Sequence, residues 1–162
     1  MTLRLAAFAL VFGACAPGPT VGVFDDEALL AELEGYTTWG SPPGWEGLRY
    51  ACDADHGPFV RLYANPLAIR GLELGSSLPD GALLVSASFQ DPEGTPKLLT
   101  AMRKVRGFAP EDDDWYWGQL DEAGTRVAVG GDIPACAACH AASDGHLRHR
   151  DGPPAWSPAD CD

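Results

Sequence analysis

Apolar residues in the first part of the chain recur at the spacing of an amphipathic helix. The repeat is formed by three leucines, Leu29, Leu30 and Leu33. Asp25 or Asp26 precedes the repeat as a candidate cap, and Gly35 follows it as a stop signal. This pattern predicts a helix that ends near Glu34 and packs its leucines against a core.

The segments that follow favour a loop, a strand and a second helix. Consecutive prolines in 41–47 (SPPGWEG) remove backbone donors, which predicts a loop. Side chains in 58–64 (PFVRLYA) alternate with period two, as they do in a strand. Asn65 and Pro66 then suit the cap and the first position of a short helix that runs through Ile69.

Three further segments are candidate strands. The turn signature in 78–81 (LPDG) precedes an apolar run in 82–89 (ALLVSASF), which predicts a core strand. The segment 97–108 (KLLTAMRKVRGF) suits a helix or a half-exposed strand equally well. A strand through 115–117 (WYW) would place its two tryptophans on one face of a sheet and the tyrosine on the other.

Length and composition favour one loop-rich domain. The chain has 162 residues, of which 19 are glycine and 14 are proline, and these residues favour many turns and short elements. No apolar run in the sequence is long enough to span a bilayer. The formal charge of −12 repels phosphate backbones and anionic lipid headgroups, so nucleic acid is excluded as a partner.

The amino terminus has the layout of a bacterial lipoprotein export signal. Residues 1–14 (MTLRLAAFALVFGA) contain one positive charge, an apolar stretch and small residues directly before Cys15. Cleavage would leave Cys15 to carry lipid on the periplasmic side of a membrane, with 15–23 as a tether and 24–162 as the folded domain. The alternative is ordinary cleavage nearby, without lipid on Cys15. Both alternatives place the domain under oxidising conditions.

The strongest chemical signal is 136–140 (CAACH), the C-x-x-C-H pattern of covalent haem attachment. Cys136 and Cys139 lie close to one helical turn apart, so both thiols face the same way and can form thioethers with the two vinyl groups of one porphyrin. His140 is then placed to ligate the iron, and Pro134 suits the start of the helix. The predicted cofactor is one covalently bound haem c.

A dithiol redox motif and a zinc site are the alternatives for this segment. A thioredoxin-type dithiol follows the first strand of a βαβ unit, and no such pattern surrounds Cys136. A zinc site would need a second pair of ligands, for which His146 and His149 are available. Because the chain carries an export signal and haem-type spacing, haem is the favoured prediction.

Cys52 and Cys161 remain once lipid and haem attachment account for the other three of the five cysteines. In an oxidising compartment these two residues can form a disulfide that pins the carboxyl-terminal tail to the domain. The alternative is two unpaired thiols, because the sequence does not show whether the two backbones approach closely enough to be bridged.

Several stretches around the haem motif follow one another in an order that resembles the cytochrome P-460 family, which includes the cytochromes c′-beta. They cover about two thirds of the chain. Of these stretches, the haem motif is the most specific match to the family. The other stretches support the resemblance through their order along the chain. The stretches are 56–68 (HGPFVRLYANPLA), 78–85 (LPDGALLV), Met102 with Lys104, 114–118 (DWYWG) and 136–141 (CAACHA).

The resemblance implies an α+β fold, mainly an antiparallel β-sheet with flanking helices, that holds one haem at the carboxyl-terminal motif. It implies that 97–108 contains a strand and that His140 is the single protein ligand of the iron. Family members that oxidise hydroxylamine carry a lysine cross-linked to the porphyrin, just after a D-G-x-x-x-V stretch. This chain has Ser86 at that position, so we expect no cross-link.

The sixth coordination site of the iron separates two functions. A second protein ligand would make the chain a pure electron carrier, whereas an open site would let it bind small gases such as nitric oxide. A methionine on an apolar strand usually fills a core, and buried aromatics pack there as readily as they line a pocket. The candidate ligands are Met102, His56, His146 and His149, and the candidate pocket walls are Trp115, Tyr116 and Trp117.

The resulting hypothesis is an exported monohaem cytochrome that performs redox chemistry on small nitrogen-oxide ligands or binds them. Its predicted partners are such a ligand, a redox protein and the membrane, through lipid on Cys15, with a homodimer as an assembly to test. As an enzyme it would be an oxidoreductase acting on small nitrogenous compounds. The alternatives are a pure electron carrier and a structural lipoprotein whose CxxC forms a disulfide.

Overall fold

The fold is an antiparallel sheet of six strands with helices on both faces. A computed structural model describes residues 24–50, 57–121, 123–141 and Leu147. Every strand pairs with the strands before and after it in the sequence, so the sheet order is the chain order. The strands are β1 (Arg49–Tyr50), β2 (Phe59–Ala64), β3 (Leu83–Phe89), β4 (Leu98–Lys104), β5 (Trp115–Leu120) and β6 (Val127–Gly131).

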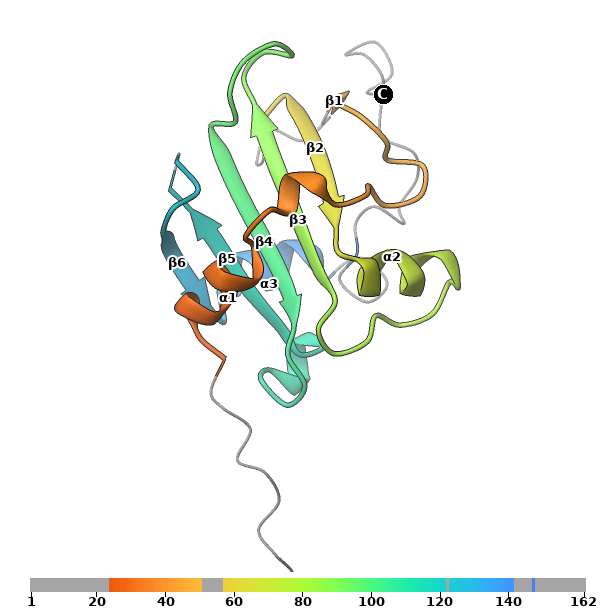
Figure 1. Ribbon diagram of the computed structural model, residues 1–162. Helices are drawn as coiled ribbons and strands as arrows, with labels where there is room; N and C mark the ends of the chain where they lie inside the picture. Colours follow the sequence, from red (N-terminus) through yellow and green to blue (C-terminus); the bar gives the residue numbers. More distant parts are fainter. Residues whose placement is uncertain (1–23, 51–56, 122, 142–146, 148–162) are drawn as a thin grey trace, which may run out of the picture.

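Three α-helices and two short 3-10 helices flank this sheet. Helix α1 lies across one face of the sheet and α3 lies across the other, while α2 follows the end of β2 (Figure 1). The predicted α+β class with a mainly antiparallel sheet is confirmed. The helices are α1 (Asp26–Glu32), α2 (Pro66–Glu73), α3 (Pro134–His140), η1 (Tyr36–Thr38) and η2 (Pro110–Asp112).

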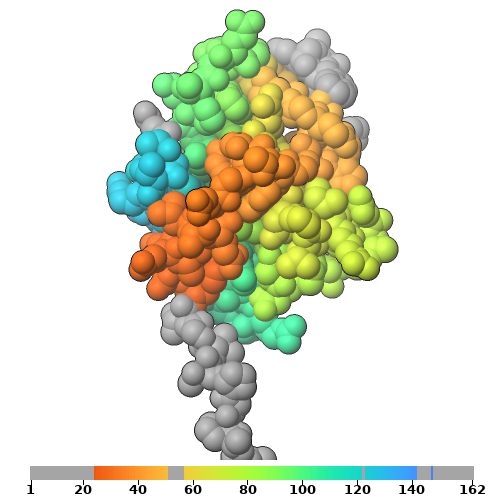
Figure 2. Space-filling view, in the orientation of Figure 1, coloured from red at the N-terminus to blue at the C-terminus, as the bar shows by residue number. Residues whose placement is uncertain are grey.

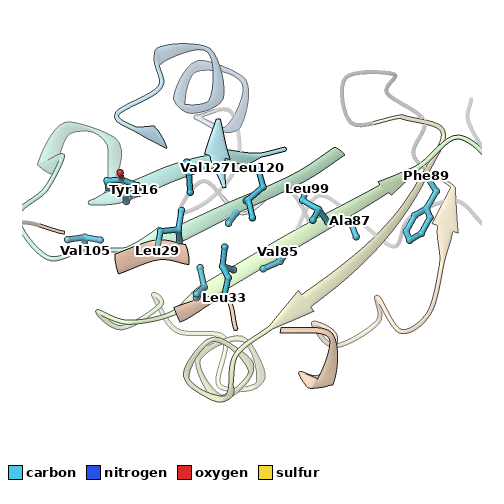
Figure 3. Close-up of a cluster of buried hydrophobic side chains, with 12 residues drawn as sticks. Leu29, Leu33, Val85, Ala87, Phe89, Leu99, Val105, Tyr116, Leu120 and Val127 are labelled. Carbon is cyan, nitrogen blue, oxygen red and sulfur yellow. The ribbon is translucent and has the colours of Figure 1, made fainter. Parts of the chain in front are cut away.

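Helix α1 forms where the leucine repeat predicts it. The Asp25 side chain caps the helix by accepting a hydrogen bond from the Ala28 backbone N–H at 2.9 Å. Leu29 and Leu33 are buried and point into a group of side chains that we call the α1-side cluster (Figure 3). Its buried members are Leu29, Leu33, Leu83, Val85, Ala87, Phe89, Leu99, Ala101, Val105, Tyr116, Leu120 and Val127.

Two glycines let α1 approach the sheet closely. Leu29 lies over Gly118 of β5, and Asp26 lies over Gly130 of β6, so an added Cβ at either glycine would overlap the side chain above it. The same approach lets the Tyr116 hydroxyl donate a 2.5 Å hydrogen bond to Asp26 Oδ1. Burial raises the pKa of Tyr116 well above its usual range, and the bond to Asp26 raises it further. Tyr116 therefore stays neutral and ties α1 to the sheet.

The opposite face of the sheet holds a second apolar group, which we call the α3-side cluster. Strand β5 confirms the predicted alternation, because Trp115 and Trp117 lie in this cluster while Tyr116 lies in the other. Met102 of β4 is buried among them, as expected for a core methionine. The buried members are Ala64, Ala68, Leu78, Ala82, Leu84, Met102, Trp115, Trp117, Ala137 and Leu147.

The segment 97–108, which suited two structures in the sequence, contains strand β4. Its charged residues are accommodated by partners from other parts of the chain. Arg103 forms ion pairs with Glu32 at 3.1 Å and with Asp80 at 3.2 Å. Lys104 is buried, pairs with the Asp113 carboxylate at 2.7 Å and lies 4.8 Å from the centre of the Trp115 ring. These contacts offset the cost of placing cations in a central strand.

Other elements agree with the sequence in position and differ in extent. The Asn65 side chain caps α2 by accepting from the Ala68 N–H, and Pro66 takes the first turn, both as predicted. The helix continues beyond Ile69 to Glu73. Strands β1 and β6 were not predicted, because β1 has two residues and β6 ends in a pair of glycines. The 41–47 segment contains no helix or strand, as expected.

The amino-terminal described segment forms a continuous band over the α1 side of the sheet. In the space-filling view, residues 24–48 run from beside β6 across the sheet and past α2 toward β1 at the opposite edge (Figure 2). Aromatic edges hold this band to the strands, as in the pair Tyr36 and Tyr63, whose ring centres lie 5.2 Å apart. Within the described ranges, no helix has the length and apolar character that crossing a membrane requires.

We expect Gly118→Ala to destabilise the fold by about 1–3 kcal/mol, because the new Cβ would overlap Leu29 Cδ2 in a packed core. Urea unfolding of the purified domain measures this loss. Gly40→Ala is the control, since a Cβ there would meet Ile69 at an ordinary 3.7 Å, and its effect should stay within about 0.5 kcal/mol. Equal losses in both variants would contradict the close approach of α1.

Candidate functional site

Helix α3 carries the three residues of the predicted haem motif. Ile133 precedes the helix and Pro134 occupies its first turn, as the sequence predicts. At about 100° per residue, Cys136, Cys139 and His140 span an arc of about 100° on one side of the helix. The two sulfurs and the imidazole are therefore presented together rather than around the whole helix.

The burial of these residues changes across that arc. Cys139 is exposed, Cys136 is half-buried against the α3-side cluster, and His140 is half-buried. Ala137, next to them on the helix, is 4% exposed and packs in the cluster. A small residue at this position lets the helix backbone lie close to the sheet. Ala137 therefore packs α3 against the sheet and keeps the neighbouring motif residues at the sheet surface.

His140 contacts the aromatic strand beneath it. Its ring centre lies 4.9 Å from that of Trp117, with an angle of 65° between the planes, which is an edge-to-face arrangement. Trp117 in turn lies 6.4 Å from Trp115, between ring centres. The sequence predicts both tryptophans as pocket walls or core residues. It does not reveal the contact between Trp117 and His140, because only the tertiary structure brings these two residues together.

The sheet surface beside this contact is apolar in one row and polar in the next. The strand register sets Leu84, Met102 and Trp117 side by side. Two residues further along their strands, about 6–7 Å away, Ser86 faces Thr100. Ser86 is the one residue of β3 that is not fully buried. It lies on the same face as α3, and its side chain has no amine.

The α3-side surface includes two buried polar atoms that lack a hydrogen-bond partner among the described residues. They are Trp117 Nε1 and Ser88 Oγ. A buried donor without an acceptor is costly and calls for an explanation, such as a bound group that supplies the acceptor. The donor set is also suitable for a haem, since one helix offers two sulfurs and an imidazole. The described residues therefore fit the predicted cofactor.

The two cysteines of the motif differ in burial. Cys136 and Cys139 are not joined to each other by a disulfide in the structure. Burial raises the pKa of Cys136, and the neighbouring Cys139 raises it further. A raised pKa leaves less thiolate near neutral pH, so Cys136 is a poor candidate for the attacking thiol of a redox dithiol.

Several predicted residues lie outside the part of the chain that the structure describes. The zinc alternative depends on two of these residues, His146 and His149. Within the described part, no three or more histidine, cysteine or acidic side chains lie close enough together to hold a metal ion. The predictions outside are the export signal 1–14, the tether 15–23 with Cys15, the pair Cys52 and Cys161, and the histidines His56, His146 and His149.

Comparison with known proteins adds no relative, since no protein-family model and no curated protein matches the chain.

We expect Cys136 to alkylate several-fold more slowly than Cys139 in the reduced, haem-free chain at pH 8. Cys136 is half-buried and its raised pKa leaves less thiolate, whereas Cys139 is exposed. A pulse of iodoacetamide followed by fragmentation of the shared peptide in a mass spectrometer measures the two rates. Faster labelling of Cys136 would contradict the packing of α3 against the sheet.

Proposed function

We propose that this chain is an exported monohaem c-type cytochrome of the cytochrome P-460 type that binds small nitrogen-oxide ligands. The observation that carries the proposal is the placement of Cys136, Cys139 and His140 on one side of α3, over an apolar and aromatic sheet surface. Export and lipid attachment at Cys15 enter the proposal from the sequence alone.

The two cysteines would hold the cofactor. Each thiol would form one carbon–sulfur bond to a vinyl carbon, while its hydrogen passes to the neighbouring vinyl carbon, so the step needs thiols and no external oxidant. The two cysteines are three positions apart on α3, and this spacing suits attachment to a single porphyrin edge. The spacing supports covalent attachment to one haem.

His140 would act as the axial ligand through its imidazole. A bound haem supplies an iron that exchanges one electron and accepts small ligands at a free coordination site. The edge-to-face contact with Trp117 restricts rotation of the imidazole, and the apolar cluster around Trp117 excludes water from that side. The chain would therefore offer an oriented histidine that faces apolar side chains on its Trp117 side.

Among the described residues the one candidate for a sixth ligand is Met102, and its position favours gas binding over pure electron transfer. Met102 is 9% exposed and packs as a core residue between Leu84 and Trp117 in the sheet register. To reach an iron it would have to leave that cluster. Ser86, on the same face, has a hydroxyl in place of the amine that a porphyrin cross-link needs. This supports ligand binding in preference to hydroxylamine oxidation.

Replacement of Cys136 and Cys139 by alanine is expected to abolish covalent haem in protein matured in a host competent for c-type cytochromes. Haem staining on a denaturing gel measures attachment, and circular dichroism checks that the variant folds. In the wild-type haem peptide, mass spectrometry should find two thioethers and no third link. Staining that survives in the double variant would refute covalent attachment.

Reduced wild-type protein is expected to have a high-spin optical spectrum that shifts when carbon monoxide or nitric oxide is added. The physical reason is an iron with His140 as its single protein ligand and an open opposite side. A titration followed in the Soret region measures binding. A sharp low-spin spectrum that ignores both gases would instead indicate a second protein ligand and an electron carrier.

A further inference from the structure

Trp117 occupies the point where the sheet meets α3. It lies in β5 between Met102 on one side and Gly131, which has no side chain, on the other. Strand β6 ends at Gly131, and α3 starts three residues later at Pro134. Because Gly131 has no side chain to cover the Trp117 indole, the chain that follows β6 can pass over it. This route brings the His140 ring centre to 4.9 Å from the Trp117 ring centre.

The two tryptophans of the α3-side cluster differ in their polar contacts. Both are buried, with Trp115 at 1% and Trp117 at 4% exposure. Among the described residues, only the Trp117 indole N–H appears as a buried tryptophan donor without an acceptor. Trp115 carries the Lys104 ammonium over its ring. Both tryptophans pack in the core. Trp117 differs from Trp115 in that its buried N–H has no acceptor within the described part of the chain and its ring contacts His140.

We infer that Trp117 is a positioning residue for the cofactor. Its edge-to-face contact holds the His140 imidazole in one orientation, and its N–H donates to a carboxylate of the bound group. This inference rests on the proposed function, because haem is the molecule that would bring an acceptor to this surface. Once the vinyl groups have reacted with the cysteines, the two propionate carboxylates are the strong hydrogen-bond acceptors at the edge of the porphyrin.

Two variants separate the two parts of this role. Trp117→Phe keeps an aromatic edge and removes the donor, whereas Trp117→Leu removes both. Trp115→Phe is the matched control, because it removes an indole from the same cluster without touching His140. All three are matured with haem, checked for folding by circular dichroism and thermal unfolding, and compared with the wild type in covalent haem content, reduction potential and electron paramagnetic resonance spectrum.

Trp117→Phe should lower the reduction potential relative to both the wild type and Trp115→Phe. Loss of the donor leaves the carboxylate charge less compensated, and that charge favours the oxidised iron. Trp117→Leu should lower the potential too and should broaden the ferric resonance signal, because the imidazole then adopts several orientations. Potentials and signals that match those of Trp115→Phe in both Trp117 variants would overturn the inference while leaving the proposed function in place.

A wild-type chain that carries no covalent haem would overturn the proposed function, and with it the role of Trp117. A second measurement uses the wild-type protein alone and so does not depend on the folding of a variant. Hydrogen exchange at the indole N–H groups, followed by nuclear magnetic resonance in haem-free and haem-loaded wild-type protein, should slow at Trp117 on loading and stay unchanged at Trp115. Unchanged exchange at Trp117 would show that the donor gains no acceptor, which contradicts the inference.

Discussion

The alternation of three aromatic side chains along β5 holds both layers of the protein to the sheet. Tyr116 faces α1, donates to Asp26 and packs its ring edge-on against Phe24, with ring centres 5.0 Å apart. Trp115 and Trp117 face the other way and form the surface on which α3 lies. A shift of β5 by one residue would exchange the two faces, so the register of this strand sets the position of α1 and of the haem motif together.

Local sequence patterns predict the helices and strands that depend on interactions between residues close together in the chain. The caps at Asp25 and Asn65, the leucine stripe of α1 and the alternation of β5 are each encoded within a few residues. Strand β4 could not be assigned, because Arg103 and Lys104 find their carboxylates far from the strand's own sequence pattern. The haem motif is likewise a local signal, whereas the contact between Trp117 and His140 exists only after the chain has folded.

Helix α3 depends on the sheet for its stability. It has seven residues and no side-chain cap at its start, and helices of this length are marginal in isolation. The packing of Ala137 in the α3-side cluster and the edge-to-face contact between His140 and Trp117 supply the stability that helix propensity alone does not give. In the proposed cytochrome, two thioethers would also join this short helix to a rigid macrocycle, so the cofactor would add a second constraint to the packing of α3 on the sheet.

The order of the strands has a consequence for how the molecule assembles. Each strand pairs with its neighbour in the sequence, so each pairing closes a single connection, and the longest of these, between β2 and β3, contains α2. All six strands of the sheet that receives α3 precede Pro134 in the sequence. Under the proposed export, a chain that enters the periplasm amino terminus first would present all six strands before Cys136 and Cys139, so the sheet would be available to receive α3 as these thiols arrive.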